Sequence, residues 1–202
     1  MNKLVSFLLF AVLLLVSVIG QSQTLRSAQQ TNPSAKYTFP DIHPQVAGLI
    51  NAKAEPEGVV FDIETLDPNA LEHLTAYVVK QVRLVKEVYP DVDVAIVSHG
   101  SEEFALQKSA KADNLGLHSV FKQLVAAEQV SVHVCGAVGG LKQLSQEDFP
   151  DFVSYSASGM AQINDYKSLG YAVVVIEQLN AEQRKQLFEH PEKYIEKQPQ
   201  VF

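Results

Sequence analysis

Cysteine is almost absent from this sequence, and tryptophan is missing altogether. Cys135 is the only thiol among 202 residues. A single cysteine cannot form a disulfide within its own chain. Cys135 is therefore an inert core residue, a partner for another molecule's thiol or a reactive site. The motifs GxGxxG, GxxxxGK[ST] and GxSxG are also absent. Their absence argues against dinucleotide-binding proteins, P-loop proteins and serine hydrolases of the usual kinds.

Positive charge is scarce as well. Lysine and arginine together number 16, against 23 aspartates and glutamates, and the net charge is −7. An acidic chain without a run of basic residues argues against nucleic acids and anionic membrane surfaces as partners.

Long apolar runs are confined to the beginning of the sequence. Residues 1–20 contain Lys3, then an apolar stretch from residue 4 to residue 19, then Gly20. This pattern is typical of a secretory signal peptide, with Val18 and Gly20 at the small-residue positions before a cleavage site. We expect a periplasmic or secreted protein with no later membrane-spanning segment; the alternative is that residues 1–20 stay attached as an anchor.

Two stretches separate this segment from the main domain. Residues 21–36 have too few apolar side chains to pack, and we expect a flexible tether there. Residues 37–57 contain scattered apolar residues among prolines and predict an irregular arm along the edge of the core. The domain itself is expected to cover residues 58–202.

From Gly58 onward, short apolar runs alternate with helical patterns. We expect a helix that follows the N-cap and proline pair Asp67-Pro68 and ends before Pro90, and a helix that ends at Gly170. Strands that are apolar throughout and alternate with helices predict a parallel sheet that is covered on both faces. The predicted fold is a three-layer α/β/α sandwich with a five-stranded, mainly parallel, flavodoxin-like sheet. Its strands are expected at residues 59–63, 92–97, 130–134, 152–155 and 171–176.

Functional sites in such folds lie beyond the carboxyl ends of the strands. That rule selects three segments, and we take their residues as the candidate site: Cys135 and His99 for chemistry, and Gly100, Gly136, Ala137, Ser158 and Gly159 for binding. Cys135 stands at the end of a strand, before Gly136, Gly139 and Gly140, and we expect a helix from about Leu141. Backbone N–H groups in such a turn favour a thiolate, which is the reactive form of cysteine. Inert packing remains the alternative.

The histidines have competing interpretations. His99 is placed to influence a thiol's protonation or to hold an anion, or else it is solvated at the rim while Gly100 makes the turn. His133 projects from the same strand face as Cys135, so the pair is a weak candidate for a metal site. A half-buried, hydrogen-bonded histidine is the simpler interpretation of His133.

No cofactor is predicted. A flavin would require a small, polar loop after the first strand, but residues 64–68 there are rich in acids that repel a phosphate. The charged stretch at residues 182–185 is most simply a solvated helix surface.

Several short segments together resemble the DsrE/DsrF-like sulfur-relay family, over about residues 58–177. The segments are the strand at 59–63 before an acid-proline turn, the strand that runs into His99-Gly100, the His133-Val134-Cys135-Gly136 strand end, the Ser158-Gly159 turn and the Leu169-Gly170-Tyr171 helix end. The resemblance implies a subunit that assembles into trimers or hexamers. It also implies that Cys135 carries sulfane sulfur as a persulfide between donor and acceptor thiols.

The sequence therefore predicts an exported DsrE-like protein that binds or relays sulfane sulfur on Cys135. It would be a carrier more than a turnover enzyme, with a thiol or persulfide protein as its possible partner. Two alternatives stay open: a non-catalytic oligomeric binding module in which Cys135 is structural, and a metal-binding protein that uses His133 and Cys135.

Overall fold

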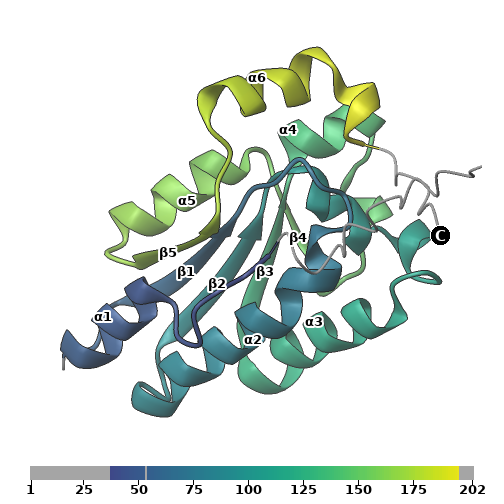
Figure 1. Cartoon of the computed structure of the whole chain (residues 1–202). Coiled ribbons are helices and arrows are strands. Elements are labelled where there is room, and N and C mark those ends of the chain that lie inside the picture. The colour runs from purple at the N-terminus through teal and green to yellow at the C-terminus, as the bar shows by residue number, and fades with distance from the viewer. Residues whose placement is uncertain (1–36, 53, 196–202) are drawn as a thin grey trace, which may run out of the picture. The chain divides into compact units, whose positions relative to one another are not determined.

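The centre of the fold is one parallel sheet. A computed structural model describes residues 37–52 and 54–195, and its five strands lie in the order β4-β3-β2-β1-β5 (Figure 1). Every neighbouring pair of strands is parallel. The strands are β1 (Gly58–Ile63), β2 (Asp93–Ser98), β3 (Val130–Cys135), β4 (Ser154–Ser156) and β5 (Ala172–Glu177).

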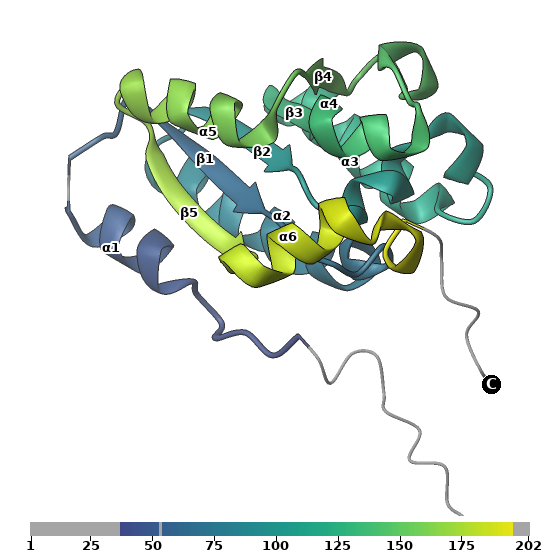
Figure 2. The same ribbon diagram turned by 90° about the horizontal axis from the view of Figure 1, so that it is seen from above.

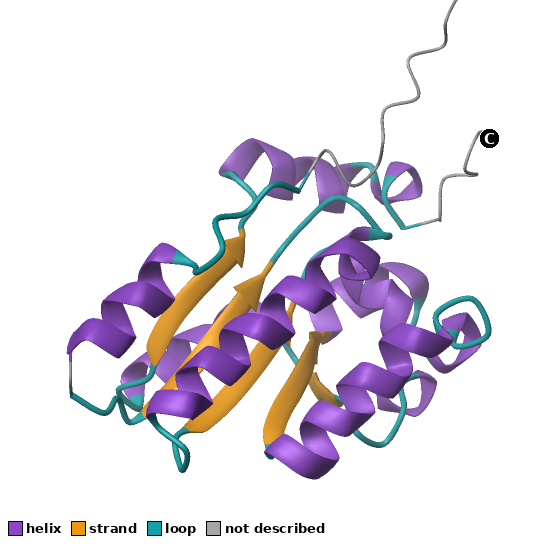
Figure 3. Cartoon of the chain, turned by 60° about the horizontal axis from the view of Figure 1, so that its bottom comes forward, coloured by secondary structure: helices purple, strands orange, loops and turns teal. Residues whose placement is uncertain are grey.

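Helices cover both faces of this sheet. The longer ones are α1 (Pro44–Ala52), α2 (Ala70–Val88), α3 (Leu115–Glu128), α5 (Gly159–Ser168) and α6 (Ala181–Glu189). Figures 1 and 3 show α2 and α3 side by side on one face, with α1 next to α2. Seen from above in Figure 2, α5 lies on the opposite face. The predicted three-layer α/β/α sandwich is confirmed, and the sheet is wholly parallel.

Short helices gather mainly in the connections at the carboxyl ends of the strands. They are α4 (Gly136–Gly139) and the 3₁₀ helices η2 (Ser101–Leu106), η3 (Lys108–Ala110), η4 (Gly140–Lys142), η5 (Gln146–Asp148) and η6 (Pro191–Lys193). The longer helix α6 also lies at this edge, as Figure 2 shows. The carboxyl edge of the sheet is therefore covered by chain.

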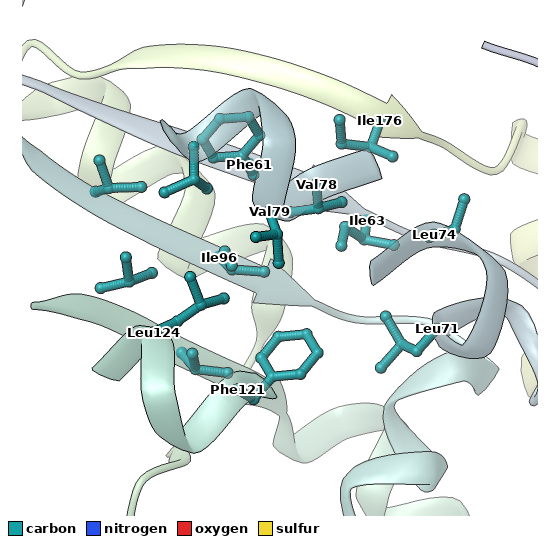
Figure 4. Close-up of a cluster of buried hydrophobic side chains, with 14 of the residues drawn as sticks. Phe61, Ile63, Leu71, Leu74, Val78, Val79, Ile96, Phe121, Leu124 and Ile176 are labelled. Atoms are coloured by element: carbon teal, nitrogen blue, oxygen red, sulfur yellow. The ribbon is translucent and has the colours of Figure 1, made fainter. Parts of the chain in front are cut away.

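The core lies mainly between the sheet and the α2–α3 layer. In β1, Phe61 and Ile63 pack toward α2, whereas Val60 belongs to a smaller apolar cluster under α5. Figure 4 shows Phe61, Ile63 and Ile96 from the strands in one cluster with Leu74, Val78 and Val79 from α2. All six β1 positions are buried, which explains why its sequence lacks polar alternation.

The arm before β1 is more ordered than the sequence predicts, because residues 44–52 form α1 rather than an irregular segment. Pro44 occupies the first helical position, which suits its fixed φ. Val46 is fully buried, and Leu49 and Ile50 pack against the core at helical spacing. The amphipathic pattern was present in the sequence, but the surrounding prolines concealed it.

Other boundaries moved by a few residues. The predicted strand at 152–155 is a shorter strand at Ser154–Ser156. Asp67 does not cap α2, since its carboxylate accepts the N–H of Asn69 and the helix begins at Ala70. The predictions for residues 1–20 and 21–36 lie outside the described residues. Among the described residues, no helix is long and apolar enough to cross a membrane.

Candidate functional site

Three neighbouring strands bring polar side chains to one face of the sheet at its carboxyl edge. Asp62 is near the end of β1, His99 follows β2 directly, and Cys135 is the last residue of β3. In β3, Val130, Val132 and Val134 point into the main core, so Cys135 points to the α5 face. The same alternation places Asp62 and His99 on that face.

The first turn of α5 packs directly on this group. A Cβ placed on Gly159 would lie 2.2 Å from His99 Cβ and 3.3 Å from Cys135 Cβ. The sum of these two distances is the upper limit for the separation of the His99 and Cys135 Cβ atoms. The absence of a side chain at Gly159 thus allows α5 to approach both residues. The predicted site residues His99, Cys135 and Gly159 do come together.

His99 is held by carboxylates and is not solvated at the rim. Its side chain is 3% exposed, its Nε2 lies 2.6 Å from Asp62 Oδ1, and its Nδ1 lies 3.6 Å from Glu64 Oε1. Burial lowers the pKa of His99, but the hydrogen bond and charge of Asp62, aided by Glu64 and Glu102, outweigh it and raise the pKa. The ring makes no hydrogen bond to the Cys135 thiol within the described part of the chain.

Glu64 extends this network to α6. Arg184 donates from Nε to Glu64 Oε1 at 2.7 Å and from Nη2 to Glu64 Oε2 at 2.5 Å. The Glu64 carboxylate also accepts the N–H of Leu179 at 3.2 Å. The stretch at 182–185, expected to be only a solvated surface, therefore holds α6 against the site through Arg184.

Cys135 is buried beneath this helix. The residue is 4% exposed and belongs to an apolar cluster with Phe104, Val138, Leu179 and Leu187. Leu187 is in α6 and Leu179 lies just before it. The helix after Cys135 begins at Gly136 rather than near Leu141, so the thiol stands at the N-cap of a short helical segment.

Glu103, in η2, is the functional candidate that sequence reasoning missed. It is fully buried, and its Oε2 accepts the backbone N–H of Cys135 at 2.8 Å. Its Oε1 has no hydrogen-bond partner among the described residues. Burial and the nearby Cys135 charge raise the pKa of Glu103 well above its ordinary value, despite the hydrogen bond from Cys135 N–H. The structure therefore places a buried carboxyl group on the backbone of Cys135, with one of its oxygens unpartnered among the described residues. The only trace of it in the sequence is a pair of acids, Glu102 and Glu103, a few residues after a buried strand.

Glu102 has a structural role. Its carboxylate accepts hydrogen bonds from Thr65 N, Thr65 Oγ1, Ser98 Oγ and Gly100 N, at 2.8 to 3.0 Å. A Cβ on Gly100 would lie 2.3 Å from the carbonyl oxygen of Thr65. Gly100, a predicted binding residue, permits close packing of two loops, and its role in binding a ligand stays a prediction.

The remaining predicted binding residues are less closely grouped. Gly136 packs against Tyr155, and Ala137 is exposed. Ser158 caps α5, and its Oγ accepts the N–H of Ala161 at 3.4 Å. The structure therefore places Ser158 next to the centre of the site through Gly159, and it leaves Ala137 at the surface.

The other histidines are occupied elsewhere. His133 Nε2 lies 2.8 Å from the Tyr166 hydroxyl, and its Nδ1 lies 3.3 Å from Ser156 Oγ. His118 Nε2 lies 3.0 Å from the carbonyl oxygen of Ala105. In the described ranges, no three histidine, cysteine, aspartate or glutamate side chains are arranged to hold a metal ion.

The chain has a structural likeness to a solved protein at low sequence identity. No protein-family model matches the chain, and no curated protein matches it. A solved structure of a protein of unknown function, MTH1491 from Methanobacterium thermoautotrophicum, is similar at 18% identity and a TM-score of 0.45. The match covers 58% of this chain and 96% of the other.

Proposed function

We propose that this protein is an exported, DsrE-like carrier of sulfane sulfur, with Cys135 as the residue that holds the sulfur. The observation that carries the proposal is the pairing of the only thiol with a buried acid: Glu103 accepts the Cys135 N–H and keeps its second oxygen unpartnered among the described residues. Buried ionisable groups with perturbed pKa values are concentrated at functional sites. A protein that only packs a cysteine has no need of this acid.

Loading would be a sulfur transfer without net oxidation. The Cys135 thiolate attacks the outer sulfur of a donor persulfide, R–S–SH. A new bond forms between Cys135 Sγ and that sulfur, the S–S bond of the donor breaks, and the donor leaves as the thiolate R–S⁻. The terminal sulfur keeps its proton, so Cys135 becomes a persulfide and the reverse reaction would pass the sulfur to an acceptor thiol.

Each neighbour of Cys135 would have a distinct role. Glu103 Oε2 accepts the backbone N–H, so the protonated acid would be able to donate from Oε1 to sulfur. His99, whose pKa is raised, contributes positive charge near the thiolate. Gly159 brings the N-terminal turn of α5 to the same place, and such a turn favours negative charge.

A second candidate is a non-catalytic binding or assembly module. It is favoured by the low exposure of Cys135, 4%, and by the apolar side chains around it. In that case Cys135 is a small core residue. Assembly into trimers or hexamers fits both candidates and would be measured by light scattering.

Intact-mass spectrometry after exposure to polysulfide separates the two candidates. The carrier predicts an adduct of one sulfur atom that is removed by a thiol reductant and is absent from Cys135→Ser. Val138→Ala, in the same apolar cluster, is the control for general loosening, because it keeps the thiol. Failure of the wild-type protein to gain sulfur, under conditions that load a small-molecule thiol, would contradict the carrier.

A further inference from the structure

A separate groove lies between α3 and the loop before β4. It has a volume of ≈ 520 Å³ and its lining includes Leu115, His118 and Lys122 from α3. These residues are three and four positions apart, so they lie on one face of the helix. Pro150 and Phe152 form the opposite wall. None of these residues belongs to the Cys135 site.

The walls of the groove are largely apolar. Leu115 is 62% exposed, which is unusual for a large apolar side chain. The His118 ring meets the Phe152 ring edge-on, with 6.2 Å between the centroids. Burial, together with the charge of Lys111, lowers the pKa of His118 despite the hydrogen bond to the carbonyl oxygen of Ala105. A flat or chain-like apolar group would find contact surface on both sides.

The rim of the groove is positive, in contrast to the chain as a whole. Lys108, Lys111 and Lys122 line it, against the single acid Asp151. Lys108 Nζ donates to the carbonyl oxygen of Glu147 at 2.8 Å. Neither Lys111 nor Lys122 has a carboxylate partner among the described residues. In a chain of net charge −7, unpaired lysines around an apolar groove are a specific feature.

We propose that this groove binds a small organic anion, with a carboxylate or sulfonate head near the lysines and an apolar body between Leu115 and Phe152. The volume is within the range of small-molecule sites, which combine an apolar lining with a few polar groups that fix orientation. The larger groove between α2 and α3, of ≈ 580 Å³, lacks this charge. There Arg83 is paired with Glu128, and Glu72 and Asp113 also line the groove.

Two fluorescent probes with a similar aromatic body test the proposal on the full chain. Anilinonaphthalene sulfonate carries the anion, and phenylnaphthylamine lacks it. We expect saturable binding of one sulfonate probe per chain, at least several-fold tighter than the neutral probe. Added salt should weaken the sulfonate probe only, because exposed charges are screened.

Two double variants test whether probe binding depends on the lysines of the groove or on the total charge of the chain. Lys111→Gln with Lys122→Gln should weaken the sulfonate probe by about two- to thirty-fold and leave the neutral probe unchanged. The matched control is Lys167→Gln with Lys185→Gln, which removes the same charge from exposed positions on α5 and α6. Leu115→Ser should weaken both probes. Equal losses in the two double variants, or equal affinity for the two probes, would overturn the proposal.

Discussion

Helix α6 should control access to Cys135, and Leu187→Ala tests this directly. Leu187 is fully buried and packs in the same cluster as Cys135. Apart from this residue, α6 is largely polar and only nine residues long, so it has little stability of its own. Such peripheral elements open locally at lower free energy than the whole domain.

The size of the effect follows from the packing. Truncating a buried leucine to alanine costs about 2–5 kcal/mol. If this free energy is lost only when α6 is packed on the domain, the population of molecules with α6 detached rises by at least about thirty-fold. Each 1.4 kcal/mol changes an equilibrium by a factor of about ten. The alkylation rate of Cys135 should rise in proportion, up to the limit set by a free thiol.

The assay is the rate of iodoacetamide modification, followed by intact mass in buffer without denaturant. With one cysteine in the sequence, every adduct reports on Cys135. Phe188→Ala is the matched control, because Phe188 is the next residue of α6 and is 44% exposed. The reasoning is refuted if Leu187→Ala lowers overall stability but leaves the alkylation rate at the wild-type value, or if Phe188→Ala accelerates it equally.

Three further predictions concern buried groups. In urea unfolding, Glu103→Gln should be more stable than wild type at neutral pH and equally stable near pH ~4. The pKa of Glu103 is raised in the folded state, so the wild-type protein loses stability as the pH rises above the pKa of this group in the unfolded chain. The raised pKa of His99 gives stability that is full below pH ~6.5 and is lost as pH rises through the folded pKa. Asp62→Asn should flatten that loss; an unchanged pH profile would contradict the assignment. Gly159→Ala should cost about 1–3 kcal/mol in thermal unfolding because its Cβ would meet His99, whereas Gly116→Ala, with open space around it, should not destabilise.

The layers of the fold could be predicted because their causes are local. The run at 59–63 is apolar at every position except Asp62, and such a run fits only a strand covered on both faces. The helices could be predicted from the spacing of their apolar residues and from residues that end a helix. Gly170, with its φ of +89°, is one of these. The shorter β4 was misjudged because Phe152 and Val153, although apolar, lie in a turn that packs on the core.

Only part of the candidate site could be predicted from the sequence. The strand-end rule located Cys135, His99 and Gly159, since parallel strands carry their ends to one edge. It could not locate Glu103, because a glutamate is ordinarily exposed and its partner here, the Cys135 N–H, is 32 residues away. The cover over the thiol was hidden for a related reason. The polar composition of α6 indicates a surface helix, and only the tertiary packing places Leu187 in the same apolar cluster as Cys135.

The buried acids are the best argument against Cys135 being inert. Asp62, Glu64, Glu102 and Glu103 are all nearly or fully buried at the same edge of the sheet. The burial of Glu102 is offset by its hydrogen bonds to two loops, and the burial of Glu64 is offset by its ion pair with Arg184. Glu103 has no such explanation, because a single backbone hydrogen bond does not offset the burial of a carboxyl group. Natural proteins keep such unfavourable groups mainly where function needs them. The expected gain in stability of Glu103→Gln would measure what the fold gives up to keep an acid beside its only thiol.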